Sequence, residues 1–182
     1  MTSTATTQTA SEISRDCAGE GTEFKMHFLR GKQIISPWHN INAYAYGDPA
    51  SEQINFVCEI PKFGRAKMEC NTKGEYNPIV QDLKKGQLRY YHGPIFWNYG
   101  FVPQTWENPN EKDSWTGYYG DGDPLDVVEI GSVKMDVGDV SVVRPLGALA
   151  MIDDGELDWK LICISANDPL ADKLQDIQDV DT

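Results

Sequence analysis

The chain has 182 residues, of which 40% are hydrophobic and 24% are charged, and its formal net charge is −12 at pH 7. This is the composition of one globular domain with a substantial core, and the acidic balance argues against a non-specific binder of nucleic acid or of anionic membranes. The longest apolar run covers residues 146–152, far short of the roughly 20 residues that a membrane-spanning helix needs.

The cysteines and the N-terminal residues indicate in which cellular compartment the protein is expected. Four cysteines occur, at Cys17, Cys58, Cys70 and Cys163. They show no C-x-x-C spacing, which argues against a zinc site and favours a reducing compartment. Residues 1–20 are rich in Ser, Thr and Ala and contain no hydrophobic signal segment. We therefore expect a flexible N-terminal tail over residues 1–20, one domain over residues 21–182, and a cytoplasmic location.

Short strands separated by turns are predicted along the first half of the chain. Residues 54–60 form a β-branched and aromatic run that ends at Pro61, which is typical of a strand. The segment 78–91 is flanked by Asn77-Pro78 and contains Lys85-Gly86. Both dipeptides favour turns, so we expect a hairpin there.

Charged side chains accompany these strands. Lys67 and Glu69 share one face of the segment 65–70, because alternate residues of a strand point to the same side. Arg89 follows Leu88 on the predicted hairpin, where a guanidinium can bond two phosphate oxygens at once. Taken alone, the first pattern describes a solvated strand face with a weak ion pair. An arginine exposed on the surface would likewise give the same sequence as one that binds phosphate.

Three aspartates lie in the stretch Asp121-Gly122-Asp123-Pro124-Leu125-Asp126, just before an apolar run that indicates a buried strand. Asp121 and Asp123 point to the same side of an extended segment, and a bend at Pro124 would bring Asp126 into the same cleft. Carboxylates this close repel one another unless a cation lies between them. Mg²⁺ and other hard cations take oxygen ligands.

Two other interpretations of this stretch remain. One is a solvated acidic turn, because Asp, Gly and Pro are common turn residues. An EF-hand loop fits less well, since that loop needs an oxygen donor where Leu125 stands and a glycine where Asp126 stands.

A second acidic cluster, residues 153–160, follows the apolar run 140–152. Arg144-Pro145 and Gly147 interrupt the run, which predicts a bulge or a bent strand. Asp158 and Lys160 have the same parity, so a carboxylate and an ammonium should emerge together from one strand face. By itself the cluster is a charged hairpin.

The last segment predicts a helix. Asn167-Asp168-Pro169 provides a capping residue followed by proline at the first helical position. Leu170, Leu174 and Ile177 then lie on one apolar stripe, at spacings of four and three.

Several of these strings, taken together and in order from about residue 24 to residue 180, resemble the soluble family I inorganic pyrophosphatases of the eukaryotic type. They are the aspartate motif 121–126, Ile-Ser-Pro-Trp-His at 35–39, Asn-Tyr-Gly-x-x-Pro-Gln-Thr-Trp at 98–106, and Asp-x-Gly-Glu-x-Asp-Trp-Lys at 153–160. The resemblance implies a mainly β (α+β) fold, an OB-like twisted five-stranded β-barrel with peripheral helices. It also implies a C-terminally truncated form, because the family continues through a further segment that bears a phosphate-binding Tyr-Lys pair.

The resemblance implies Mg²⁺-dependent hydrolysis of inorganic pyrophosphate to two phosphates, with a metal-bound hydroxide as the nucleophile. It further implies a homodimer for the full-length protein, with no direct nucleic-acid or membrane partner. It assigns the following roles: catalysis to Asp123 and Tyr99; substrate binding to Arg89, Lys67 and Lys160; metal binding to Asp121, Asp126, Asp158, Asp153 and Glu59; and a place in the cleft lining to Glu69.

Two alternatives of other classes stay open. The first is a catalytically impaired pyrophosphatase-like interaction subunit, which the expected truncation favours and the intact acidic positions oppose. The second is a simple Ca²⁺-binding module, which the additional Lys, Arg and Tyr residues disfavour.

Overall fold

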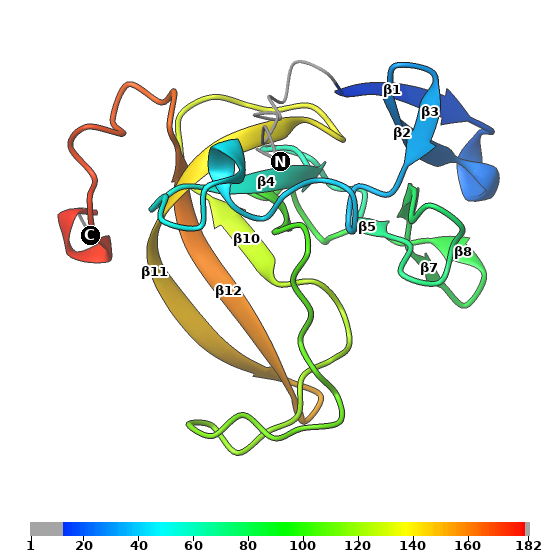
Figure 1. Cartoon of the computed structure of the whole chain (residues 1–182). Helices are drawn as coiled ribbons and strands as arrows, with labels where there is room; N and C mark the ends of the chain where they lie inside the picture. Colours follow the sequence, from blue (N-terminus) through cyan, green and yellow to red (C-terminus); the bar gives the residue numbers. More distant parts are fainter. Residues whose placement is uncertain (1–12, 181–182) are drawn as a thin grey trace, which may run out of the picture.

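The structure is a computed structural model that describes residues 13–180. Its centre is a closed barrel of five strands in the order β10-β12-β11-β4-β9. The bounds are β4 Ile54–Ile60, β9 Asn98–Phe101, β10 Asp126–Glu129, β11 Val140–Asp153 and β12 Glu156–Ser165. The long β11 and β12 cross the molecule side by side and join at a tight hairpin (Figure 1). The predicted five-stranded barrel is therefore confirmed.

A second sheet lies beside the barrel (Figure 1). It has the strand order β1-β2-β6-β5, with β3 paired to β2. The bounds are β1 Ile13–Ala18, β2 Lys25–Arg30, β3 Gln33–Ile35, β5 Met68–Cys70 and β6 Ile79–Gln81. The predicted hairpin is also confirmed: β7 Leu83–Lys84 pairs with β8 Gln87–Leu88. Lys85 and Gly86 in its turn both have positive φ, at 55° and 76°, which suits the twist of a two-residue hairpin.

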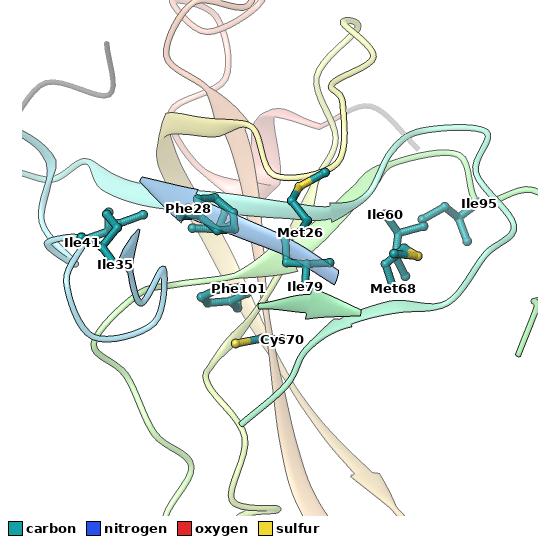
Figure 2. Packing of buried hydrophobic residues seen from close by; sticks show 11 residues of the cluster. Met26, Phe28, Ile35, Ile41, Ile60, Met68, Cys70, Ile79, Ile95 and Phe101 are labelled. Atoms are coloured by element: carbon teal, nitrogen blue, oxygen red, sulfur yellow. The ribbon is translucent and has the colours of Figure 1, made fainter. Parts of the chain in front are cut away.

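Two hydrophobic clusters hold these sheets together. Inside the barrel, Phe56 and Cys58 of β4 pack with Val127 and Cys163. The intervening Val57 points the other way, into the cluster between the barrel and the second sheet. That cluster, shown in Figure 2, brings Met26 and Phe28 of β2 and Ile79 of β6 against Phe101 of β9. β4 is apolar on both faces for this reason, since neither face meets water.

The predicted irregularity in β11 is present. The register between β11 and β12 shifts between Pro145 and Gly147. Proline has no amide hydrogen to donate to the ladder, so a bulge at this point is the expected response. The shift lies well before the end of the hairpin, where Asp153 pairs with Glu156.

The predicted helix after Asp168 is wrong. Within residues 13–180 the only helical segments are short 3-10 turns, η2 Gly21–Glu23, η3 Ala45–Gly47 and η4 Ile177–Asp179, so the expected peripheral helices are reduced to these. The carbonyl of Ala171 accepts from Arg144 Nη1 at 2.7 Å and from the side chain of Gln175. In a helix that carbonyl would accept from the backbone N–H of Gln175, which instead donates to Asp179. None of these helices is long and apolar enough to cross a membrane.

The predicted boundary of the N-terminal tail also changes. Residues 1–12 lie outside the described part of the chain, but residues 13–18 form β1, which pairs antiparallel with β2 along its whole length. Arg15 Nη1 donates to Asp139 Oδ1 and to the carbonyl of Val137, both at 2.7 Å. These contacts attach a polar segment to the domain although it has almost no buried side chains.

Candidate active site

One cleft of about 490 Å³ lies where the open end of the barrel meets β5 and the segment before β10. Every residue singled out from the sequence lines it, although they come from separate parts of the chain. They are Glu59, Lys67, Glu69, Arg89, Tyr99, Asp121, Asp123, Asp126, Asp153, Asp158 and Lys160. The bend at Pro124 therefore does bring the three motif aspartates to one place. Tyr91, Asp154 and Met151 also line the cleft and were not predicted.

Lys160 lies at the centre of the acidic wall. β10 and β12 run parallel with Asp126 opposite Lys160, and Asp158 shares a face of β12 with Lys160, as predicted. The ammonium of Lys160 donates to Asp126 Oδ2 at 2.5 Å and to Asp158 Oδ1. The hydroxyl of Tyr99 donates to the same oxygen of Asp126. Lys160 and Asp158 are both buried, so this network is held away from bulk water.

Burial shifts the pKa values of the residues in this acidic wall. Burial raises the pKa of Asp126 to about 7, against the opposing effect of Lys160. For Lys160, burial alone would lower the pKa, but Asp126 and Asp158 raise it overall. Burial and the neighbouring Asp126 also raise the pKa of Tyr99. Tyr99 and Lys160 thus keep their protons at neutral pH and act as hydrogen-bond donors.

A second group of charged side chains, the cationic wall of Lys67 and Arg89, lines the same cleft. Asp82 bonds both cations of this wall: its Oδ2 accepts from Arg89 Nη1 at 2.8 Å and from Lys67 Nζ at 3.3 Å. Lys67 also reaches Glu69 at 3.3 Å. The backbone repeats the pattern, because the N–H of Asp82 donates to Lys67 and that of Arg89 donates to Asp82. Asp82 was missed from the sequence, since its role depends on contacts between segments far apart in the chain.

Glu59 and Asp153 occupy different environments. Glu59 is buried on β4, and its Oε1 accepts from the N–H of Cys70 at 2.6 Å. Burial and then the charge of Asp126 raise its pKa well above the ordinary value. Asp153 is exposed at the end of β11, at the rim of the cleft. Of the two, Asp153 is freer to turn toward a ligand.

Glu107 is another residue that the sequence did not single out. It is buried, and an oxygen of its carboxylate lies within 4.8 Å of oxygens from Asp121 and Asp158. Its Oε1 accepts from the N–H of Trp159 at 2.9 Å. Burial raises the pKa of Glu107 to about 8, with Asp121 and Asp158 adding to the effect. It stands at the end of an aromatic string, where no pattern of spacing connects it with the aspartates.

The donor set of the cleft fits a hard divalent cation. Its acidic side chains outnumber its three basic ones, and no histidine is present among the described residues that line it. Three carboxylates converge within 4.8 Å, a crowding that burial makes costly without a positive charge. Oxygen-only sites of this kind suit Mg²⁺ or Ca²⁺ rather than zinc.

The metal-free protein is expected to lose stability as the pH rises from about 5 to about 8. Folded Glu107 and Asp126 hold their protons up to about pH 8 and about pH 7, whereas unfolded carboxyls release them near pH 4. In this window the folded state binds more protons, so raising the pH favours unfolding, by up to about 1.4 kcal/mol per pH unit for one titrating group. Urea unfolding midpoints in EDTA across this range measure the effect.

Other carboxyls have a pKa that is lowered in the folded state, but they do not affect the urea unfolding midpoints in this pH range. Hydrogen bonds to Arg89 and Lys67 outweigh burial and lower the pKa of Asp82, and bonds from Leu170 and Ser132 do the same for Asp168. The stability that these groups provide is lost only below about pH 4. A midpoint that stayed constant or rose between about pH 5 and about pH 8 would contradict the prediction.

Comparison with known proteins gives one consistent family. The profile of the inorganic pyrophosphatase family matches residues 56–182. A soluble inorganic pyrophosphatase 1 named as chloroplastic, from Chlamydomonas reinhardtii, is 49% identical over 173 residues, which cover 95% of this chain and 60% of that protein. An inorganic pyrophosphatase from Bos taurus is 51% identical over 84% of this chain and 54% of its own length.

Solved structures agree in fold. The type I inorganic pyrophosphatase of Toxoplasma gondii superposes with a TM-score of 0.86 at 45% identity, over 92% of this chain and 75% of that one. A vacuolar soluble pyrophosphatase of Trypanosoma cruzi, truncated at its N-terminal domain and in complex with PPi, gives a TM-score of 0.84 at 44% identity, over 92% and 70%. The chain spans about 60% or less of the length of the curated relatives. On its sequence and its fold, the chain belongs to the inorganic pyrophosphatase family.

Proposed function

We propose that this chain hydrolyses inorganic pyrophosphate to two phosphate ions and that it requires Mg²⁺. The observation that supports the proposal most strongly is that the carboxylates share one cleft with Arg89, Lys67 and Lys160. Phosphoryl transfer depends mainly on positioning and on neutralising charge. A polyanion and a cluster of carboxylates are compatible in one site only when cations lie between them.

In this proposal Asp121, Asp126 and Asp158 hold the metal, with Asp153 and Glu59 as further ligands directly or through water. Bound Mg²⁺ would neutralise phosphate oxygens and lower the pKa of a water molecule. Asp123 stands exposed at the mouth of the cleft, where its carboxylate can orient the attacking water and accept its proton. The metal set is oxygen-only, which is the preference of Mg²⁺.

The cationic wall would bind the phosphates. Arg89 can bond two phosphate oxygens at once, and Lys67 supplies a point charge. Asp82 keeps both side chains at the cleft by bonding each of them. In the acidic wall, Lys160 and the protonated Tyr99 hydroxyl would donate to the departing phosphate.

The proposal also includes a cytoplasmic location and a homodimer for the complete protein. An exposed aromatic patch supports the dimer: Phe63 and Phe96 meet edge to face at 6.2 Å and are 59% and 69% exposed. Aromatic surface of this kind commonly marks an interface. Sedimentation of the complete protein tests the dimer. Cell fractionation tests the location against a chloroplast, which the names of two relatives offer as the alternative.

The activity is tested by measuring phosphate release from pyrophosphate by the purified chain, in Mg²⁺ and in EDTA. Release that requires Mg²⁺ is the expected result. Binding of Mg²⁺ and pyrophosphate without turnover would instead support a catalytically impaired interaction subunit. Binding of Ca²⁺ without any binding of phosphate would support a calcium-binding module.

A further inference from the structure

Only one of the two carboxylate oxygens of Glu107 has a hydrogen-bond partner among the described residues. The residue is 8% exposed, and one oxygen, Oε1, accepts from the N–H of Trp159. The other oxygen, Oε2, is buried and has no hydrogen-bond partner among the described residues. A buried carboxylate oxygen without a partner is costly in an apolar environment, so a native site that keeps one calls for an explanation.

No basic side chain supplies the missing charge. Within residues 13–180, Glu107 forms no ion pair, and Lys160, which pairs with the neighbouring Asp158, is already shared with Asp126. The neighbours of Glu107 are instead carboxylates, since oxygens of Glu107, Asp121 and Asp158 all lie within 4.8 Å of one another. A divalent cation bonded to one oxygen from each residue would neutralise all three groups together.

The backbone holds Glu107 in this position. Its N–H donates to the carbonyl of Asp123, and its own carbonyl accepts from Gly122, both at 2.9 Å. The backbones of Gly120 and Glu107 lie so close together that a Cβ on Gly120 would lie 2.4 Å from the carbonyl carbon of Glu107. Glu107 is therefore fixed against the aspartate motif on one side and against β12, through Trp159, on the other. Such rigidity suits a ligand whose geometry is set before the metal arrives.

We infer that Glu107 is a direct ligand of a divalent cation held between Asp121 and Asp158. The inference rests on the proposed function, because Asp121 and Asp158 belong to the metal set proposed there. It adds a ligand from the segment between β9 and β10. The competing explanation is a purely structural role, in which Glu107 serves only as an acceptor for Trp159.

The variant Glu107→Gln separates these roles, because glutamine keeps an oxygen for the Trp159 N–H and removes the charge. Mg²⁺ binding without pyrophosphate, followed by titration calorimetry, is expected to weaken by more than the roughly 10-fold to 100-fold that the loss of an outer-shell partner costs. The shift in unfolding temperature that Mg²⁺ produces should shrink accordingly. In EDTA the variant should be at least as stable as the parent, since an unpaired buried carboxylate has been removed. Glu111→Gln, an exposed position in the same segment, should leave all three measurements unchanged.

Three outcomes decide the matter. Unchanged Mg²⁺ affinity in Glu107→Gln would overturn the inference. So would a variant that is destabilised in EDTA yet keeps the full stabilisation by Mg²⁺, since that pattern marks a structural role. Asp121→Asn identifies failure of the underlying proposal: if it too keeps Mg²⁺ affinity, the proposed metal site is wrong, whereas if it alone loses affinity, only the role of Glu107 is wrong.

Discussion

Replacing Lys160 with methionine is expected to lower the free energy of unfolding of the metal-free protein by about 3–5 kcal/mol at neutral pH. The ammonium bonds Asp126 and Asp158 at once and is itself buried. Methionine fills a similar volume but leaves two neighbouring carboxylates without their shared cation. Urea unfolding in EDTA measures the loss, and added Mg²⁺ should restore part of it because the metal supplies positive charge to the same carboxylates.

Two comparisons make the Lys160 result interpretable. Lys134→Met, at an exposed position, should change stability by less than about 0.5 kcal/mol. Adding Asp126→Asn to Lys160→Met should recover stability, because one of the two unpaired charges is then removed. A cost below about 1 kcal/mol for Lys160→Met would contradict the prediction, because the network would then contribute no more than a surface ion pair.

Under the proposed mechanism, replacing Asp123 with alanine is expected to reduce turnover of pyrophosphate by about 10²-fold to about 10⁴-fold, the range for loss of a general base. Asp123 differs from its neighbours because its side chain is exposed at the cleft mouth, while Asp158 is buried against Lys160. Its carboxyl is nevertheless partly desolvated where it borders the cleft, and this desolvation and then the charge of Asp121 raise its pKa, which makes it a better proton acceptor. Initial rates of phosphate release in saturating Mg²⁺ measure the effect.

The Asp123 prediction requires that metal binding and folding survive. The turn that positions the motif uses the backbone N–H of Asp123, which donates to Asp121 Oδ1 at 2.9 Å, and alanine keeps that donor. Mg²⁺ affinity and the unfolding midpoint should therefore change little. Asp172→Ala, an equally exposed aspartate outside the cleft, serves as the matched control. Equal rates for the Asp123→Ala variant and the parent would remove Asp123 from the mechanism.

The amino-acid sequence alone predicted features that depend on neighbours along the chain. Strand periodicity placed Asp158 and Lys160 on one face, Lys85-Gly86 predicted the hairpin turn, and the proline-glycine interruption predicted the bulge in β11. These predictions held because side-chain parity and turn geometry are set within a few residues. The family resemblance then indicated eleven of the residues that line the cleft; Tyr91, Met151 and Asp154 were not among them.

Tertiary contacts decided the remainder. A capped and amphipathic segment after Asp168 did not become a helix; the carbonyl of Ala171 accepts from the side chains of Arg144 and Gln175 instead of from the backbone N–H of Gln175. The polar residues 13–18 became a strand because the edge of β2 was open to them. Asp82 and Glu107 contact the site residues only because segments distant in sequence come together in the fold. The spacing of residues along the chain cannot predict such contacts. Local backbone preferences set the strands and turns, whereas long-range hydrogen bonds and buried charge determined which side chains share the cleft.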